Sequence, residues 1–525
     1  MTTTPQQGRG AINPWLIAVS VMFATFMEVL DTTVVNVSLP HIAGSLSSTV
    51  DEATWVLTSY LVANAIVLPM TGWLANFFGR KRLLMMSVTG FTLASFFCGF
   101  APSLAWLIIF RIIQGTAGGA LQPLSQAVLL EAFPPEERGK AMAFWSLGIV
   151  VAPILGPVLG GWLTDAYSWR WVFYINIPVG IASLVMTRLF IFDPSYIRRM
   201  SSRVDYWGIG MLAVGIGALQ VVLDKGQQED WFSSHWITGL LVLSLVSLSV
   251  MIVYELRKQN PVVNLRVFKE RTYATGVFLM TCLGFVLFGS LVLLPIWLQT
   301  LLGYPALQAG FALAPRGVGS FLMMPLVGIL IPKTDARKLL GLGIVTSALT
   351  MFAFARLNLN AGYWDFFWPQ FIQGISLAFL FVPLTTISMG PIPKEQIGNA
   401  ASLFNLLRNL GGSFGIAAST TLVARHQQVY TNILGAHITP YGPRSYAALH
   451  GLQSSLEVRG SDPVTAARQS YVMMFGLVER HAAILSFLDV FRLLGIIFLL
   501  ASPLILLMKK PRSMARGTAA RQPSD

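Results

Sequence analysis

Long apolar segments are the feature that most restricts the fold of this chain. They recur from residue 14 to residue 508, and most of them approach or exceed the roughly 20 residues that an α-helix needs to cross a bilayer. A backbone in lipid must pair its own N–H and C=O groups, so such segments form helices. Hydrophobic residues make up 54% of the chain and charged residues only 11%, against about 25% charged in soluble proteins. The sequence therefore predicts an all-α, polytopic membrane protein.

The apolar segments predict fourteen membrane-spanning helices. The first segment, residues 1–13, is polar and lacks the charged start and short apolar run of a cleaved signal peptide, so we expect the first span to be retained. The expected spans are 14–38, 52–76, 82–101, 104–130, 138–163, 169–191, 205–223, 236–256, 272–299, 305–331, 337–356, 364–391, 396–424 and 485–508.

The net charge of +13 is distributed as a membrane topology signal. Most of the 36 Lys and Arg residues fall on one side of the predicted spans, including the basic tail 509–525. The side rich in Lys and Arg is usually the cytoplasmic one. We therefore expect both termini in the cytoplasm, contact with the lipid bilayer, and no nucleic-acid partner.

Motifs for metals, nucleotides or catalytic nucleophiles are missing from the sequence. Cys98 and Cys282 fall inside apolar spans, and the six histidines form no metal-ligand pair. A lipid-processing membrane enzyme would carry clustered acids or histidines at metal-ligand spacing, and a sensor would carry a soluble signalling domain. We therefore expect no metal, no cofactor and no enzymatic activity.

Two halves of the chain share short matching segments. PPEERGKA (134–141) matches PKEQIGNA (393–400) at an offset of 259, and the same offset relates IIQG (112–115) to FIQG (371–374). At an offset of 256, the segment that begins at Gly72 aligns with the segment that begins at Gly328. Both offsets indicate that one unit has been duplicated, as in transporters built from parallel repeats.

The repeat predicts an arrangement of six plus two plus six helices. The two six-helix halves are 14–191 and 272–508, and the segment 205–256 matches neither of them. We expect this inserted helix pair to pack outside the twelve-helix core and not to line a central cavity.

Small residues recur at every fourth position in two of the spans. Such strips let helix backbones approach closely, either for static packing or for relative motion of the halves. Two prolines inside the first strip each remove a backbone donor and can bend the helix. The strips contain Gly148, Gly156 and Gly160 with Pro153 and Pro157, and Gly411 and Gly415 in the second half.

Three charged residues of the first half lie deep inside predicted spans, where a charge costs roughly 2.5–3.5 kcal/mol on insertion scales. Glu28 and Asp31 are one helical turn apart, and Arg111 is in the fourth span. From a rise of ~1.5 Å per residue, Asp31 and Arg111 lie at a similar depth, and Glu28 lies nearer the midplane. The group resembles a proton-carrying site, and a static ion pair that only fixes helix packing is the alternative.

Other polar residues extend these charges into a predicted substrate cavity. Arg111, Gln114 and Gln122 share one face of the fourth span by their helical spacing. Arg408 in the second half is placed either to bind a carboxylate or a substrate, or to hold helix carbonyls. The predicted cavity residues are Tyr60, Asn64, Gln114, Gln122, Asn405 and Arg408.

Several motifs along the chain resemble a known family of transporters. They are LDTTVVNVSLP (30–40), GWLANFFGRKR (72–82), RIIQG (111–115) and GIVVAPILGPVLGG (148–161). In this order and spacing they resemble the major facilitator superfamily, and within it the fourteen-helix drug/proton antiporters of the EmrB/QacA-like group. WRWVFYINIPVG (169–180) and LDKGQQEDWFSS (223–234) are similar to segments of EmrB-like exporters.

The resemblance implies a proton-driven antiporter that exports hydrophobic, amphipathic or cationic drugs across a bacterial inner membrane by alternating access. An exporter of one defined metabolite on the same fold is the alternative. Asp31 belongs to the first-span motif and is expected to be the main proton-linked residue, with Arg111 as its electrostatic partner. Glu28 is expected to be a modulator or a contact for cationic substrates.

The motif between the second and third spans departs from the family at one position. Gly72, Gly79 and Arg80 match it, but Asn76 stands where the family usually has an aspartate. In the family, that carboxylate helps to lock the outward-open state. Asn76 can form hydrogen bonds but brings no charge to such a latch. The basic residues that follow also fit the positive-inside rule.

The predicted outer loop 425–484 is far longer than the other outer loops. It carries arginines on the side where the positive-inside rule disfavours them, and 445–458 is able to form an amphipathic helix on the membrane surface. The resemblance implies a membrane-anchored periplasmic adaptor as a partner. We expect the loop to contact this adaptor, and a surface loop without a partner is the alternative.

Overall fold

The structure, a computed structural model, describes residues 13–134, 136–193, 205–259, 261–438 and 442–509. All regular elements in these residues are helical, in agreement with the predicted fold class. The first half of the molecule consists of α1 (Pro14–Ser45), α2 (Val50–Ala53), α3 (Trp55–Val67), α4 (Thr71–Phe78), α5 (Arg80–Phe100), α6 (Leu104–Gly118), α7 (Leu121–Ala132), α8 (Arg138–Ala166), α9 (Trp171–Tyr174) and α10 (Asn176–Phe190).

An inserted pair, α11 (Tyr206–Lys225) and α12 (His235–Arg257), follows the first half. Short 3-10 turns complete several of the connections. The second half consists of α13 (Arg271–Thr300), α14 (Ala306–Leu330), α15 (Ala336–Phe354), α16 (Tyr363–Met389), α17 (Ile397–Ala436), α18 (Pro443–Val458) and α19 (Pro463–Ala501).

The count of fourteen spans is not confirmed. In the described residues, twelve helical segments are long and apolar enough to cross a membrane, or thirteen if the bent α8 counts as one span. The helix that falls short is α17, because serine, asparagine, glutamine and arginine recur along its length. A helix that buries its polar residues against other helices does not need a uniformly apolar surface.

Polar side chains fix where several of the helices begin. Asn13 accepts a hydrogen bond from the N–H of Trp15 at the start of α1, and Asp205 accepts one from Gly208 at the start of α11. Asp462 does the same at the start of α19. An N-cap of this kind typically contributes about 1 kcal/mol to helix stability.

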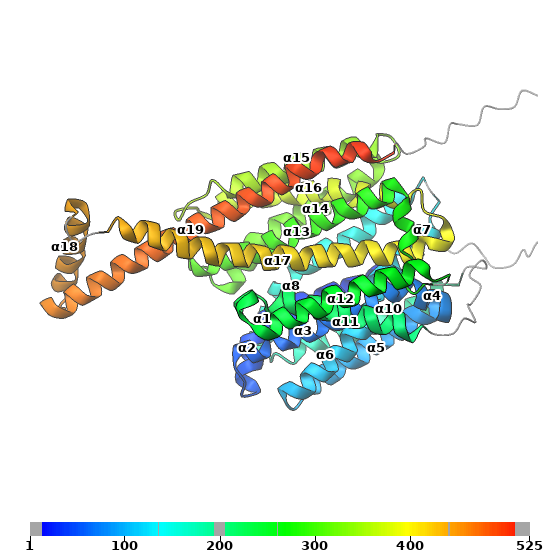
Figure 1. The fold of residues 1–525 in the computed structure, drawn as a ribbon, viewed down its shortest axis with the longest axis horizontal. Coiled ribbons are helices and arrows are strands. Elements are labelled where there is room, and N and C mark those ends of the chain that lie inside the picture. Colours follow the sequence, from blue (N-terminus) through cyan, green and yellow to red (C-terminus); the bar gives the residue numbers. More distant parts are fainter. Residues whose placement is uncertain (1–12, 135, 194–204, 260, 439–441, 510–525) are drawn as a thin grey trace, which may run out of the picture.

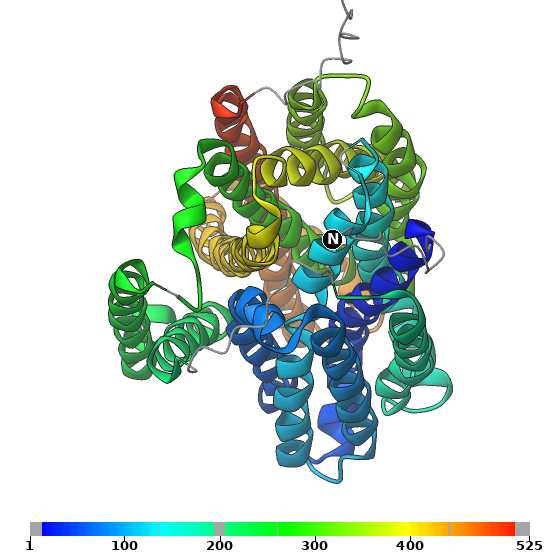
Figure 2. The same ribbon diagram turned by 90° about the vertical axis from the view of Figure 1, so that its right-hand side faces the viewer.

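The two halves lie side by side and meet closely at the end of the bundle opposite α18 (Figures 1 and 2). The N–H of Gly72 in α4 donates to Ser402 Oγ of α17 at 3.1 Å. A Cβ at Gly72 would lie 2.7 Å from the Asn399 backbone, and one at Gly328 of α14 would lie 3.0 Å from Lys140 Cα. Glycine is therefore needed where the halves touch.

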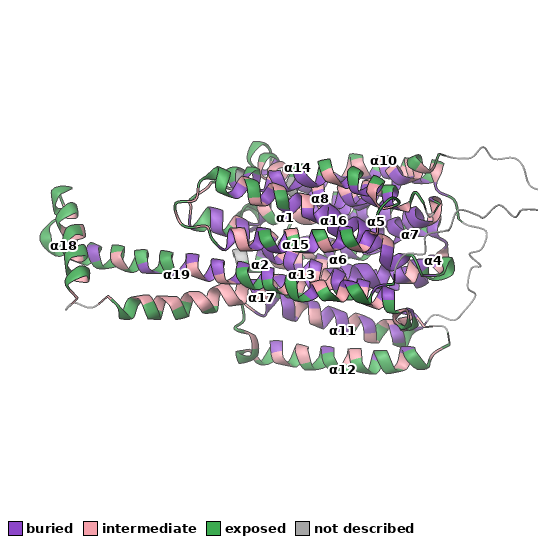
Figure 3. Ribbon diagram, turned by 90° about the horizontal axis from the view of Figure 1, so that it is seen from above, coloured by how far each residue is buried: buried purple, intermediate pink, exposed green. Residues whose placement is uncertain are grey.

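The inserted pair packs at the outer edge of the bundle, where Figure 2 shows it as two green helices. Only 17% of an apolar 18-residue stretch of α12 is buried, against 78% of the equivalent stretch of α16. Exposed residues run along α12 in Figure 3. α11 lies closer to the centre, against α3 and α17. Its Gln220 exchanges hydrogen bonds with Ser413 of α17 and reaches the central cavity. The expectation that neither inserted helix lines the cavity is therefore wrong for α11.

The segment expected as a long outer loop, 425–484, is largely helical. α17 continues to Ala436 and α19 already begins at Pro463, so both helices project beyond the bundle (Figure 1). The helix expected near 445–458 is α18, and it lies across the tip of this projection rather than beside the bundle. The projecting turns are largely exposed (Figure 3), and polar or charged residues such as Glu479, Arg480 and His481 interrupt the apolar run there, so hydropathy does not join these turns to the predicted spans.

Candidate functional site

A central cavity of about 190 Å³ lies between the two halves. Its wall is mainly apolar, and it receives side chains from α1, α3, α7, α8, α11, α13, α14, α16 and α17. The charged residues among its described lining are Glu28, Arg316 and Arg408. An apolar cavity with a few polar groups is the usual form of a small-molecule site.

Asp31 of α1 lies in a closed cluster of polar side chains. Its Oδ2 accepts a hydrogen bond from Arg111 Nη1 at 2.6 Å. Its Oδ1 accepts from Gln114 Nε2 at 2.9 Å and from Asn176 Nδ2 at 2.7 Å. Asp31 and Arg111 are both fully buried. Several hydrogen bonds of good geometry are what a buried ion pair needs to offset the loss of water around both charges.

Arg111 is fixed on its other side by α3. Its Nε donates to the Val56 carbonyl at 3.0 Å, and its guanidinium carbon lies 4.2 Å from the centre of the Tyr60 ring. A cation is attracted to an aromatic face at this distance. The structure therefore brings Asp31 and Arg111 together and ties α1, α3, α6 and α10 to one point, but neither residue lines the cavity.

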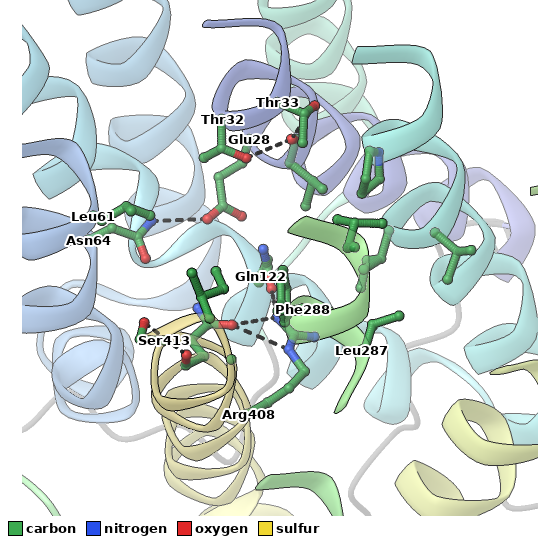
Figure 4. A pocket seen from close by; sticks show the side chains of 18 of the residues that line it. Glu28, Thr32, Thr33, Leu61, Asn64, Gln122, Leu287, Phe288, Arg408 and Ser413 are labelled. Atoms are coloured by element: carbon green, nitrogen blue, oxygen red, sulfur yellow. Dashed lines mark hydrogen bonds between the residues drawn. The ribbon is translucent and has the colours of Figure 1, made fainter. Parts of the chain in front are cut away.

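Glu28 lies one turn from Asp31 and faces the cavity (Figure 4). Its Oε1 accepts a hydrogen bond from Asn64 Nδ2 at 3.0 Å, whereas its Oε2 is buried with no hydrogen-bond partner among the described residues. Gln122 of α7 lies close to the same carboxylate and accepts a hydrogen bond from Arg408 of α17. Polar contacts therefore cross the cavity from one half to the other.

The second half presents two buried arginines to the cavity. Arg408 donates to Gln122 and to Asn409, and its Nη1 has no partner in the described residues. Arg316 of α14 donates from Nε to Gln370 Oε1 at 2.7 Å. Its Nη1 and Nη2 have no acceptor in the part of the chain that the structure describes. The two side chains are 3% and 2% exposed, respectively.

Some predicted cavity residues lie behind the cavity wall. Tyr60, Asn64, Gln122 and Arg408 line it, as Figure 4 shows for the last three. Gln114 instead bonds Asp31. Asn405 donates to Gln126 of α7 at 2.5 Å. Depth along a helix can be estimated from sequence, but the direction of a side chain depends on how the helices pack.

Three residues of the site were missed by sequence reasoning. Asn176 lies in WRWVFYINIPVG, where one amide stands in an apolar segment. Arg316 is a charge inside a predicted span, which by itself marks a functional candidate. Gln220 gave no signal beyond being polar within an apolar helix.

At the junction of α4 and α5, Gly79 has φ +88°, a conformation that favours glycine. Asp193 accepts a hydrogen bond from the N–H of Lys81 at 2.8 Å at the same place. Asn76 is half-buried on α4, and the buried ion pair of this region joins Arg80 to Glu131 of α7. Fixed charge near the junction therefore comes from this pair and from Asp193, and not from position 76.

The small-residue strips lie at close helix contacts. Side chains at Gly156 and Gly160 of α8 would collide with Thr33 and Val34 of α1. α8 bends by about 40° between its parts Arg138–Pro153 and Leu155–Ala166. The remaining strip contacts are Gly148 with Met22, Pro157 near Gly310, Gly411 with Thr281 and Gly415 with Phe285, and Pro153 lines the cavity.

Comparison with protein families gives one match over most of the chain. The family described as Major Facilitator Superfamily matches residues 21–416.

Two bacterial proteins are similar to this chain over most of its length. The chain is 41% identical over 443 residues to the multidrug export protein EmrB of Escherichia coli (strain K12). The aligned residues cover 83% of this chain and 86% of that protein. It is 39% identical over 506 residues to the fatty acid resistance protein FarB of Neisseria gonorrhoeae. The aligned residues cover 96% of this chain and 97% of that protein.

Solved structures share the fold at low identity. A double-tryptophan mutant of XylE has a TM-score of 0.61 at 15% identity, covering 95% of this chain and 97% of that one. The human transporter MFSD10 has a TM-score of 0.60 at 12% identity, covering 94% and 99%.

Proposed function

The chain belongs to the Major Facilitator Superfamily, and we propose that it is a secondary active exporter in which protons drive hydrophobic or amphipathic compounds out of the cell. It is a multi-span helical transporter of the efflux type and not an enzyme. Proton antiport, alternating access and the range of compounds are the proposal.

The observation that carries the proposal is the cavity between the halves, which combines an apolar wall with the titratable carboxylate of Glu28. An apolar wall suits compounds that differ in shape, because dispersion contacts need no fixed partner geometry. One oxygen of Glu28 has no partner in the described residues. That oxygen is available to a proton, to water or to a cationic substrate.

We assign proton coupling to α1, which carries both carboxylates. Asp31 is the proposed main proton-linked residue, because its protonation would weaken the ion pair with Arg111 that ties four helices together. Glu28 is the carboxylate that the cavity reaches directly. Coupling then means that protonation on α1 changes how tightly the first-half helices hold one another.

Alternating access is supported by the close contact of the halves at one end of the bundle. Glycines at that contact allow backbone packing without interlocking side chains, as Gly72 does against Asn399. Such an interface can separate and re-form as the halves rock about the cavity. We propose that this end is cytoplasmic in a bacterial inner membrane, together with both termini, in accord with the distribution of Lys and Arg.

We propose a periplasmic adaptor as partner, docked on the projection formed by α17, α18 and α19. The projection extends beyond the bundle (Figure 1), and its apolar side chains Tyr471, Val472 and Phe475 are exposed. Cross-linking from exposed Arg444 in native membranes should capture a membrane-anchored protein. Capture of lipid or of this chain alone would contradict the partner.

The test of function uses the purified protein in proteoliposomes with an imposed pH gradient and a panel of neutral and cationic dyes. Accumulation should follow the gradient and stop when an ionophore collapses it. Substrate movement should also release or take up protons in the opposite direction. Transport that is unchanged by the ionophore would contradict proton antiport.

A further inference from the structure

The internal repeat shows which residues of the second half correspond to the Asp31–Arg111 site. At the offset of 256, Tyr60 corresponds to Arg316, and at the offset of 259, Arg111 corresponds to Gln370. Both pairs are in contact, since Arg111 lies over the Tyr60 ring and Arg316 donates to Gln370. The guanidinium of this contact therefore comes from α6 in the first half and from α14 in the second half.

Backbone packing supports this correspondence independently of the side chains. A Cβ at Gly115 would collide with the carbonyl of Tyr60, and one at Gly374 would collide with the carbonyl of Arg316. Gly115 and Gly374 are also related by the offset of 259. The two glycines let equivalent helices approach at the same level in both halves.

The second half has no acid where the first half has Asp31. α13 holds the place of α1, because Gly415 of α17 packs on Phe285 of α13 as Gly156 of α8 packs on Thr33 of α1. No Asp or Glu occurs in Arg271–Thr300, the residues of α13. In the part of the chain that the structure describes, Arg316 consequently has no carboxylate partner such as Arg111 has in Asp31.

The donors around Arg316 are left without acceptors. Arg316 Nη1 and Nη2, and Gln370 Nε2, are all buried with no hydrogen-bond partner in the described residues. Gln370 is 0% exposed and Arg316 is 2% exposed, and Arg316 lines the cavity. A buried guanidinium without a carboxylate is unfavourable. A ligand anion would satisfy these donors as Asp31 satisfies Arg111 and Gln114.

We propose that Arg316 and Gln370 bind the carboxylate of an amphipathic acid that the cavity transports. Two guanidinium N–H groups match the two oxygens of a carboxylate, and an arginine is favoured over a lysine for this geometry. The wall of the same cavity also includes Leu291, Leu377 and Phe381, which suit a hydrocarbon chain. With one acid and two arginines, the described lining carries a net positive charge.

This inference rests on the proposed export function and names the substrate class of the same cavity. It also separates the roles of the two cavity arginines. Arg408 already donates to Gln122 and Asn409, so fewer of its donors are available to a ligand. Arg316 is therefore the substrate-binding arginine, and Arg408 is a positioning residue for Gln122.

The test measures binding to the detergent-purified full chain without any gradient. Radiolabelled dodecanoate is the ligand, and its methyl ester and dodecyltrimethylammonium are competitors with the same chain. The wild-type protein should bind the acid at least ~10-fold more tightly than either competitor. Equal affinity for acid and ester, or preference for the cation, would overturn the proposal.

Substitutions of Arg316 test whether the carboxylate of the ligand binds there. Arg316→Gln should raise the Kd of dodecanoate by ~10-fold or more and leave that of the ester within about twofold. Arg316→Lys keeps the positive charge and should therefore raise the Kd of dodecanoate less than Arg316→Gln does. Arg356→Gln, at an exposed arginine between α15 and α16, is the matched control and should change neither value. Equal losses for acid and ester in Arg316→Gln would mean that Arg316 only supports the fold.

Two outcomes are kept apart by this design. If Arg316→Gln does not fold, the wild-type ranking and the Arg316→Lys variant decide the question. If proton-driven export of a neutral dye is intact but no acid preference exists, only this inference fails. If the acid binds as expected but transport ignores the pH gradient, the proposed function fails and the binding site stands.

Discussion

Asp31 and Glu28 lie one turn apart on α1, yet the fold gives them opposite surroundings. Asp31 is sealed behind the cavity wall and accepts hydrogen bonds from Arg111, Gln114 and Asn176. Glu28 lines the cavity and accepts one hydrogen bond, from Asn64. Two carboxylates only one helical turn apart therefore differ in what can reach them. Asp31 takes part in helix packing, and Glu28 faces the central cavity.

Arg111→Ala should have the largest effect, because it leaves Asp31 buried without its cation. Loss of one partner of a buried ion pair typically costs ~3–5 kcal/mol. Thermal unfolding of the purified protein measures this loss. The double variant Arg111→Ala with Asp31→Asn should recover part of the stability, because no charge is stranded. A double variant that is no more stable than Arg111→Ala would show that the ion pair is not the cause.

Asp31→Asn should abolish gradient-driven export while keeping substrate binding, since an amide resembles the protonated acid. Weaker hydrogen bonds to Arg111 should lower stability by ~1.5–3 kcal/mol. Transport in proteoliposomes and abundance in the membrane are measured together. A folded variant that still exchanges protons for substrate at the wild-type rate would move the coupling role elsewhere and favour a static ion pair.

Gly156→Ala tests whether the position of α1 matters for both carboxylates. A Cβ at this site would collide with Thr33, and such overpacking typically costs ~1–3 kcal/mol. Gly161→Ala is the matched control on the same helix, because nothing lies within 4 Å of its Cβ. Unfolding temperatures of the two variants should separate clearly. Equal temperatures would mean that α8 and α1 adjust freely at this contact.

Glu28→Gln should leave stability nearly unchanged, because the cavity-facing carboxylate makes a single hydrogen bond to protein. Its effect should depend on the substrate. Export of cationic dyes should fall more than export of neutral dyes, since only the former lose an ionic contact. Dye-by-dye transport rates measure the difference. An equal fall for both kinds of dye would assign Glu28 to coupling rather than to substrate charge.

Lys258→Met should have the smallest effect on export, because the ion pair that it breaks lies at the end of α12. Lys258 Nζ is 2.5 Å from Asp205 Oδ2, and the Lys258 side chain is 32% exposed. Burial would raise the pKa of Asp205, but hydrogen bonds from Lys258 and Gly208 outweigh it and lower that pKa. Asp205 is only 5% exposed and keeps its hydrogen bonds from Gly208 and Tyr254, so the expected loss of stability is ~1–2 kcal/mol, between that of an exposed pair and that of a buried pair.

The pH dependence of this loss follows from the lowered pKa. A carboxyl group with a depressed folded-state pKa contributes stability above its unfolded pKa of about 3.9 and loses it as the pH falls further. Wild type and Lys258→Met should therefore differ in unfolding temperature at neutral pH and converge in acid. A difference that grows in acid would contradict the assigned pair.

The sequence alone determined the helical class, and it predicted the duplicated halves and a similar depth for Asp31 and Arg111, which the structure brings into contact. It did so because lipid forces backbone groups into helices, and because a fixed rise per residue converts position into depth. It did not predict the helical projection at 425–484, since charged residues such as Glu479 and Arg480 interrupt the apolar run that hydropathy detects.

Only the tertiary structure decided which side chains face the cavity. Gln114 and Asn405 share depth with cavity residues but point to Asp31 and Gln126, and Gln220 enters from a helix outside both halves. The rotation of a helix about its axis is set by contacts with helices far away in sequence, such as those at Gly156 and Gly374. For the same reason, the donors of Arg316 and Gln370 that lack a carboxylate partner become visible only when α13, α14 and α16 are packed together.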